Sequence, residues 1–235
     1  MPIKFTIFQK FPGLKYGMSE KLDGAMEIAY GDFQQADNRR AFLNRQEIDE
    51  SKTVSPRQIH SSEVVKVNES HRGKTILDAD GLVTNSHNLF LTVTVADCFP
   101  IYFYNPASNF IGLAHSGWRG TASNIAGQAI GHISGNPKNI IAGIGPGIGP
   151  CHFEIKNDIL PKFADYPEAI IKRNVKLFVD LPMIIKKQLI AAGLKVRNIE
   201  NCGECTFCLK EKYFSYRRDK PKYIEAMIAY IGLKM

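Results

Sequence analysis

A thiol and an imidazole follow two apolar segments near the middle of the chain. Cys98 comes shortly after the segment Leu89 to Val95, and His115 follows the segment Phe110 to Ala114. Both segments are predicted to be β-strands. Strand ends that open into glycine-rich loops are where α/β proteins commonly place reactive groups. We therefore expect the two side chains to lie at corresponding ends of neighbouring strands.

Basic side chains next to predicted helix starts form a second kind of candidate. Thr121 to Ile133 is rich in small residues and is predicted to be a helix that begins directly after Gly120, with Arg119 beside its start. Free backbone N–H groups and a guanidinium at that point suit a phosphate or carboxylate. A plain strand-to-helix turn is the equally good alternative. Arg217 and Arg218, near the C-terminus, are further anion-binding candidates.

The cysteine content favours free thiols over disulfides. Five cysteines are an odd number, and three of them, Cys202, Cys205 and Cys208, recur at a spacing of three. A structural zinc needs four ligands, no Cys or His follows Cys208, and the nearest histidine upstream is His152. Free or redox-active thiols are therefore the prediction here, with a structural zinc as the alternative.

The elements that must position these groups indicate a single α/β domain covering residues 1–235. Further strands are predicted over 63–67 and 140–144, and a helix begins within 36–43, with Asp37 or Asn38 as its cap. Asp180, Pro182 and Gly193 mark the start and end of another helix. The loop from Gly145 to Cys151 lacks the glycine spacing of a dinucleotide site.

The composition of the chain limits the classes of binding partner and the cellular compartment that we expect. The net charge of +7 is spread over short, mixed runs, which favours a solvated surface or a small anionic ligand over nucleic acid. The first residues lack the apolar segment of a signal peptide, and Asp97 and Pro100 interrupt the longest apolar region. We expect a cytoplasmic protein with no membrane span.

Three motifs taken together resemble the YfiH/YlmD/laccase-domain family. They are Gln58-Ile59-His60, Ala96-Asp97-Cys98 and His115-Ser116-Gly117-Trp118-Arg119-Gly120, accompanied by DGLVT from Asp80 and FSYRRD from Phe214. The family is also called multicopper polyphenol oxidase or peptidoglycan editing factor PgeF, and its animal relative is the purine nucleoside phosphorylase laccase-domain protein. Single motifs are weak, but their order and spacing are specific.

The resemblance implies a fold, a metal and an activity. The fold is a four-layer α/β/β/α sandwich of mixed sheets related to the cysteine hydrolases, and the metal is a catalytic zinc held by His60, Cys98 and His115. The activity is phosphorolysis of adenosine, inosine, guanosine and methylthioadenosine, with deamination of adenosine. Purine nucleosides and phosphate are then the partners, and the protein is expected to be a monomer or homodimer.

The chemistry of these residues supports a zinc ion. Two imidazoles and one thiolate suit Zn²⁺, and three protein ligands leave a position open, as in catalytic sites. Copper is less suitable, because blue-copper sites add an axial methionine and the chain has none between Met26 and Met183. A lone histidine such as His60 in a polar loop is by itself usually an ordinary surface residue.

The sequence offers several candidates for the phosphate-binding and proton-shuttling roles. Arg119 is the first phosphate candidate and Arg217 or Arg218 the second. A deaminase also needs a carboxylate that does not bind the metal. Asp80, Asp97 and Glu63 are the candidates, and the sequence does not choose among them.

Three departures from the family pattern keep other functions open. Lys15 stands where relatives carry an arginine before glycines, residues 26–30 replace a leucine-asparagine-leucine segment, and residues 223–226 replace a glycine-arginine pair. A lysine does not reproduce the bidentate fork of arginine. The alternatives are a metal-free Cys98–His115 thiol hydrolase, an amide hydrolase acting on peptidoglycan precursors, and an inactive ligand-binding member of the family.

Overall fold

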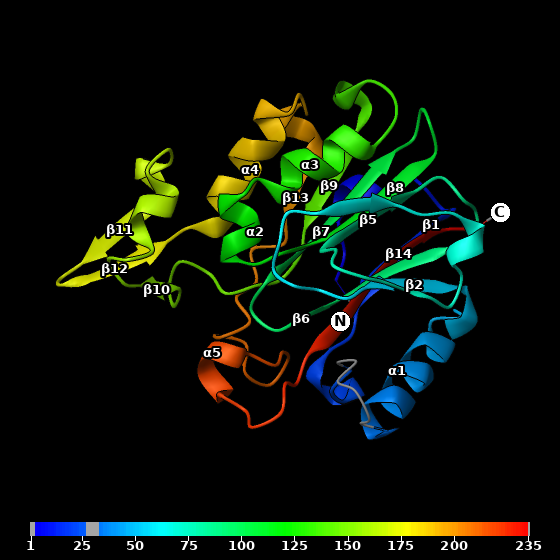
Figure 1. Cartoon of the computed structure of the whole chain (residues 1–235), viewed down its shortest axis with the longest axis horizontal. Helices are drawn as coiled ribbons and strands as arrows, with labels where there is room; N and C mark the ends of the chain where they lie inside the picture. The colour runs from blue at the N-terminus through cyan, green and yellow to red at the C-terminus, as the bar shows by residue number, and fades with distance from the viewer. Residues whose placement is uncertain (1–2, 27–32, 235) are drawn as a thin grey trace.

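The computed structural model describes residues 3–26 and 33–234, and two large mixed sheets dominate it (Figure 1). Within these residues the six-stranded sheet has the order β13 (Ile199–Asn201), β9 (Ile141–Ile144), β7 (Phe99–Asn105), β8 (Phe110–Ser116), β5 (Gly81–Thr84) and β3 (Val64–Lys66). The five-stranded sheet has the order β1 (Leu14–Met18), β14 (Met227–Leu233), β6 (Phe90–Val95), β2 (Thr53–Pro56) and β4 (Thr75–Ile76).

A small antiparallel sheet and several helices complete the described residues. The small sheet has the order β10 (Glu154–Ile155), β12 (Lys176–Val179) and β11 (Ile170–Arg173). The α-helices are α1 (Phe33–Arg45), α2 (Trp118–Ala122), α3 (Ile125–His132), α4 (Leu181–Ala191) and α5 (Tyr216–Asp219). The 3-10 turns are Thr6–Phe8, Lys21–Asp23, Glu50–Lys52, Glu69–His71, Pro137–Asn139, Leu160–Phe163, Pro167–Ala169 and Val196–Asn198. No helix in the described part of the chain is long and apolar enough to span a membrane.

Three apolar clusters account for the packing of these elements. One joins α3 and α4 to a face of the six-stranded sheet, through residues such as Ile130, Ile185 and Phe103. The second lies between the two large sheets, and the third joins α1 to the outer face of the five-stranded sheet. Figure 1 shows α1 and the α3–α4 pair on opposite sides of the sheets. The mixed α/β class is confirmed, and the four-layer α/β/β/α arrangement stays a prediction.

Most of the predicted elements occur close to their predicted positions. β6, β8, β9 and β3 lie within a residue or two of the predicted strands, because β-branched, apolar runs bounded by polar residues specify buried strands. Asp180 caps α4 through a bond from the Met183 N–H to its Oδ1, at 2.9 Å. The sequence therefore locates these four strands and the start of α4.

Two helix predictions are wrong in detail. The helix expected over 121–133 is two helices, because Asn124 adopts the left-handed region (φ 59°) and its side chain caps α3 by accepting from Gly127 N–H. α1 begins at Phe33, so Asp37 and Asn38 lie inside the helix and are not its cap. Asn38 instead donates to the carbonyl of Ala25 at 3.1 Å.

The chain crosses between the two large sheets directly before Cys98. β6 and β7 are consecutive in sequence, yet β6 belongs to the five-stranded sheet and β7 to the six-stranded sheet. Asp97 makes the turn with a φ of 83°. Cys98 therefore adjoins His115 because β7 pairs with β8, with Phe99 opposite Ser116, and not because β6 does.

Candidate metal centre and cavity

Two imidazoles and a thiol converge at the ends of β7 and β8. One ligating atom from each of His60, Cys98 and His115 lies within 4.8 Å of the others. The two imidazole rings are nearly perpendicular, with centroids 4.8 Å apart. His115 is buried and His60 is exposed, so the group spans from the sheet edge to the surface. The structure thus brings together all three residues expected at one centre.

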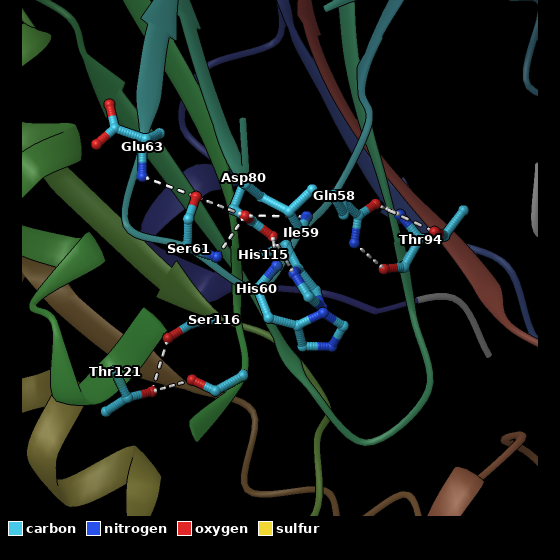
Figure 2. Close-up of polar contacts among 11 residues, drawn as sticks. Gln58, Ile59, His60, Ser61, Glu63, Asp80, Thr94, His115, Ser116 and Thr121 are labelled. Carbon is cyan, nitrogen blue, oxygen red and sulfur yellow. Dashed lines mark hydrogen bonds and ion pairs between the residues drawn. The ribbon is translucent and has the colours of Figure 1, made fainter. Parts of the chain in front are cut away.

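Asp80 organises two of the three side chains (Figure 2). Its buried carboxylate accepts from His115 Nδ1 at 2.8 Å, which leaves Nε2 of that ring facing the thiol and the other imidazole. The same carboxylate accepts the backbone N–H groups of Ile59, His60 and Ser61 at 3.2, 3.0 and 2.6 Å, and the Ser61 hydroxyl at 2.8 Å. Asp80 therefore positions ligands and is not a free base.

The loop that carries His60 is held at two further points. The Gln58 side chain donates to the carbonyl of Thr94 at 2.8 Å and accepts the Thr94 N–H at 2.8 Å (Figure 2). This pair of bonds fastens the loop to β6. His60 itself has a φ of 61°, a left-handed conformation that costs a non-glycine residue about 1–2 kcal/mol. The loop is held in a costly shape that directs an imidazole toward Cys98.

Cys98 and His115 favour their charged forms together. Burial alone would raise the pKa of the Cys98 thiol, but the positive charge of His115 and hydrogen bonds from both imidazoles lower it to about 6. Burial likewise opposes protonation of His115, yet the thiolate and the Asp80 carboxylate raise its pKa to about 9. A thiolate is the form that binds a metal or attacks an electrophile.

The glycine that follows β8 leaves room for the sulfur. A Cβ placed at Gly117 would lie 2.8 Å from Cys98 Sγ and 3.2 Å from His60 Cδ2. Real Cβ atoms do not approach sulfur so closely, so any larger residue would displace a ligand. Glycine is therefore required at position 117 of the His115 to Gly120 motif for steric reasons.

A cavity of about 810 Å³ opens over the three side chains. This volume is within the usual range for small-molecule sites. Aromatic side chains of Trp118, Phe153 and Tyr216 line part of it, and Ile148, Leu181 and Ile224 add apolar surface. The cavity is suited to a ligand with a flat apolar part and a polar part near the metal-binding group.

The basic candidates separate into two groups. Arg119 and Arg217 line the cavity, and the guanidinium of Arg119 lies 4.3 Å from the centroid of the Trp118 ring. Arg218 does not line it: its guanidinium binds both oxygens of Asp219 at 2.7 Å and three backbone carbonyls. Arg218 therefore holds its own loop together and does not face this cavity.

Sequence reasoning missed a buried arginine in the cavity wall. Arg39, in α1, is 6% exposed and donates to Ser55 Oγ at 2.8 Å and to Thr92 Oγ1 at 3.4 Å. Its Nε lies 3.3 Å from a Glu50 carboxylate oxygen. No local motif indicates this role, because it depends on how α1 packs against the outer face of the five-stranded sheet.

The carboxylate candidates are occupied or distant. Asp97 lines the cavity but accepts from Thr206 Oγ1 at 2.6 Å and from the Arg217 N–H at 2.7 Å. Glu63 is exposed, and Figure 2 shows its carboxylate pointing away from the imidazoles. Asp97 is the sole carboxylate among the described residues that line the cavity.

Only some of the residues that depart from the family pattern line the cavity. Lys15 pairs with Glu47 at 3.0 Å and is not among the described residues lining the cavity. Residues 27–30 lie outside the described part of the chain. Ile224 and Ala226, by contrast, line the cavity, so the altered C-terminal segment does shape the site.

The chain matches known proteins over almost its whole length. The family described as multi-copper polyphenol oxidoreductase laccase has a sequence model that matches residues 7–234. The chain is 30% identical to "Purine nucleoside phosphorylase YlmD" of Bacillus subtilis over 231 residues, covering 92% of this chain and 83% of that protein. It is 34% identical to the protein of the same name from Geobacillus stearothermophilus over 194 residues, covering 74% of this chain and 70% of the other.

Solved structures agree with the expected fold. The crystal structure of YlmD from Geobacillus stearothermophilus has a TM-score of 0.88 and 30% identity, covering 97% of this chain and 94% of that one. The structure of a Bacillus licheniformis hypothetical protein YfiH has a TM-score of 0.88 and 29% identity, covering 94% and 93%.

Proposed function

The chain belongs to the multi-copper polyphenol oxidoreductase laccase family, and from this premise we propose that it is a zinc-dependent purine nucleoside phosphorylase. The expected substrates are adenosine, inosine, guanosine and methylthioadenosine, each cleaved by phosphate. The observation that carries the proposal is the convergence of His60, Cys98 and His115 at the base of an 810 Å³ cavity. The names of the relatives supply the reaction class.

The donor set supports zinc. A thiolate and two imidazoles within 4.8 Å of one another fit the ligand types and spacing of a Zn²⁺ site with a fourth position left for substrate or water. Of the described residues that line the cavity, none is a methionine, so the axial ligand of a blue-copper site is missing there. Bound zinc would polarise a substrate oxygen or lower the pKa of its water.

The remaining walls support a nucleoside and a phosphate. Trp118, Phe153 and Tyr216 offer aromatic faces for a purine, and the guanidinium groups of Arg119 and Arg217 offer bidentate donors for phosphate oxygens. Phosphate attack at the sugar carbon releases the free base and ribose 1-phosphate. In this scheme the arginines hold the attacking anion, while the apolar walls exclude water that would compete with it.

Deamination of adenosine is proposed as the minor activity. It needs a carboxylate that shuttles protons without binding the metal. Asp97 has the right location, but its two oxygens already accept from Thr206 and from the Arg217 N–H. We therefore expect inosine formation from adenosine to be slower than phosphorolysis.

We propose that residues 1–235 act as one catalytic domain, because the cavity draws on both large sheets. Arg39, Ser55 and Thr92 come from the side of the five-stranded sheet, and His115 comes from the six-stranded sheet. The cytoplasmic location and a monomeric or dimeric state stay predictions from the sequence.

The test is a product assay with matched variants. Untagged protein is incubated with inosine and phosphate, and free hypoxanthine and ribose 1-phosphate are measured. Arg119→Ala should raise the KM for phosphate at least about tenfold, because a charge-assisted contact is worth about 1.5–3 kcal/mol. Arg72→Ala, an exposed arginine near Glu69, is the control. No phosphate-dependent product from wild type would refute the proposal.

A thiol hydrolase is the second candidate, supported by the Cys98–His115 pair. The lowered pKa of Cys98, about 6, matches an activated nucleophile. The two functions differ in their need for His60 and for metal. A hydrolase acting on an amide would keep its rate after chelation and would be inactivated by a thiol-alkylating reagent at Cys98, whereas the phosphorylase would lose its rate after chelation.

A further inference from the structure

We propose that Cys151, His152, Cys205 and Cys208 form a second metal site, a structural zinc site separate from the cavity. One ligating atom from each residue lies within 4.8 Å of the other three. Cys151 Sγ lies 3.5 Å from Cys205 Sγ and 3.6 Å from Cys208 Sγ, and His152 Nδ1 lies 3.3 Å from Cys208 Sγ. Cysteines and a histidine from two distant segments therefore surround one point.

The spacing fits a single tetrahedral ion. Ligands at about 2.3 Å for Zn–S and about 2.0 Å for Zn–N are about 3.5–3.8 Å apart in a tetrahedron. The observed separations of 3.3–3.6 Å are close to these values. An iron–sulfur cluster would need wider spacing, because irons and sulfides lie between its thiolates. Three cysteines and one histidine are also a usual structural zinc set.

The surroundings hold the four ligands in place. The Gly149 N–H donates to Cys205 Sγ at 3.2 Å, the kind of amide-to-sulfur bond that supports a metal-bound thiolate. The His152 ring stacks on Phe207 with centroids 3.9 Å apart and an angle of 14° between planes. Cys151 and Cys208 are exposed, which is unusual for cysteines that only pack.

Four protein ligands close the coordination shell, so the site is structural. It joins the turn after β9 to the segment that precedes α5. Both segments continue into the cavity wall. Ile148 and Phe153, close to Cys151 and His152, line the cavity, and so does Arg217 in α5. Asp97 connects them, since its carbonyl accepts from Ile148 N–H at 2.8 Å and its carboxylate accepts from Arg217 N–H at 2.7 Å. The second zinc therefore stabilises the cavity wall that carries Arg217.

Cys202 lies outside this cluster and provides the matched control. Its N–H donates to the carbonyl of Ile144 at 3.0 Å, and its thiol packs against the core between the sheets. The repeating spacing of Cys202, Cys205 and Cys208 in the sequence therefore combines one packing cysteine with two ligands. The other two ligands come from more than 50 residues upstream, where the sequence offers no repeat.

The experiment counts zinc per chain by elemental analysis of untagged protein and variants. Wild type should hold about two ions, Cys208→Ser about one, Cys202→Ala about two, and the double variant Cys208→Ser/His60→Asn about none. A Cys208→Ser protein with the same zinc content as wild type would overturn the second site. If instead only the cavity site is empty, wild type holds one ion, Cys208→Ser none and His60→Asn still one, so the two proposals fail separately.

A second measurement uses the wild-type protein, so it does not depend on a variant folding. Cysteines are alkylated with and without a chelator, and the modified peptides are identified by mass spectrometry. Cys151 and Cys208 should be protected from the reagent until the chelator removes the ion. Immediate alkylation of these exposed thiols, or a disulfide linking any two of the three ligand cysteines, would overturn the proposal.

Discussion

His60 is the residue whose substitution separates ligand loss from backbone effects. Its φ of 61° disfavours alanine, but asparagine adopts the left-handed region readily. His60→Asn should therefore fold normally and lose zinc from the cavity site, with phosphorolysis falling more than about 100-fold, beyond the effect of losing an outer-shell partner. Zinc analysis and the inosine assay measure both effects.

His60→Ala is the companion variant. It should lose the same zinc and also unfold more easily, by about 1 kcal/mol in metal-free protein, because alanine is strained at this φ. Equal stability of the two variants in urea would contradict the backbone argument. Full zinc and full rate in His60→Asn would contradict the ligand assignment itself.

Asp80 holds His115, one of the three proposed metal ligands. Asp80→Asn replaces an oxygen that accepts from buried N–H groups with an amide that donates, so the orientation of the His115 ring is lost. Outer-shell partners of this kind change metal affinity by about 10–100-fold. Competition titration with a chromophoric chelator should show a loss of that size.

Asp78→Asn is the matched control for Asp80. Asp78 is two residues away and pairs with Arg57 at 2.6 Å on the surface. Exposed ion pairs contribute about 0–1 kcal/mol. Zinc affinity should be unchanged in this variant, and an equal loss in both variants would mean that the effect is not specific to the His115 contact.

At the level of secondary structure, the turn from β8 to α2 sets the space around the metal centre. Gly117 has an ordinary extended backbone (φ −79°), so glycine is needed there for space and not for conformation. Gly117→Ala should move Cys98 Sγ or His60 and weaken zinc binding about tenfold or more. The same chelator titration measures this.

Gly131→Ala in α3 is the control for Gly117→Ala, because space is free at this glycine. A Cβ at Gly131 meets nothing within 4 Å, and alanine favours helix over glycine by about 0.5–1 kcal/mol. The variant should be more stable by that amount and keep wild-type zinc affinity. Unchanged zinc affinity in the Gly117→Ala protein would contradict the steric argument, because it would mean that Cys98 Sγ can move aside without leaving the metal.

Over the whole molecule, the sequence predicts features that depend on neighbouring residues better than features that depend on contacts between distant parts of the chain. The apolar runs of β6 and β8 and the cap of α4 are local patterns, and they were located to within a residue or two. The crossing of Asp97 between sheets was missed, because no local signal distinguishes a turn within a sheet from one between sheets.

Locality also decides which site residues the sequence reveals. His60, Cys98 and His115 are predicted to meet because their motifs are distinctive in this order, and the structure places them within 4.8 Å of one another. The contact of Arg39 with Thr92 and that of Cys151 with Cys205 join residues more than 50 positions apart. Such contacts follow from the packing of complete layers, which single-residue patterns do not encode.

Zinc removal is predicted to lower the thermal stability of the whole chain. A ligand present at 100 times its Kd contributes about 2.7 kcal/mol per site. For a domain of this size each kcal/mol shifts Tm by about 2–4 °C, so chelation should lower Tm by about 5–10 °C or more. The double variant Cys208→Ser/His60→Asn should show no further decrease with chelator, and an equal decrease there would point to an effect of the chelator itself.

The presence of zinc between His60, Cys98 and His115 is best tested by anomalous X-ray diffraction at the zinc absorption edge, on crystals of untagged protein. The expected result is an anomalous peak among these three side chains, at the base of the cavity. Crystals that bind zinc elsewhere but give no peak between these three side chains would contradict it.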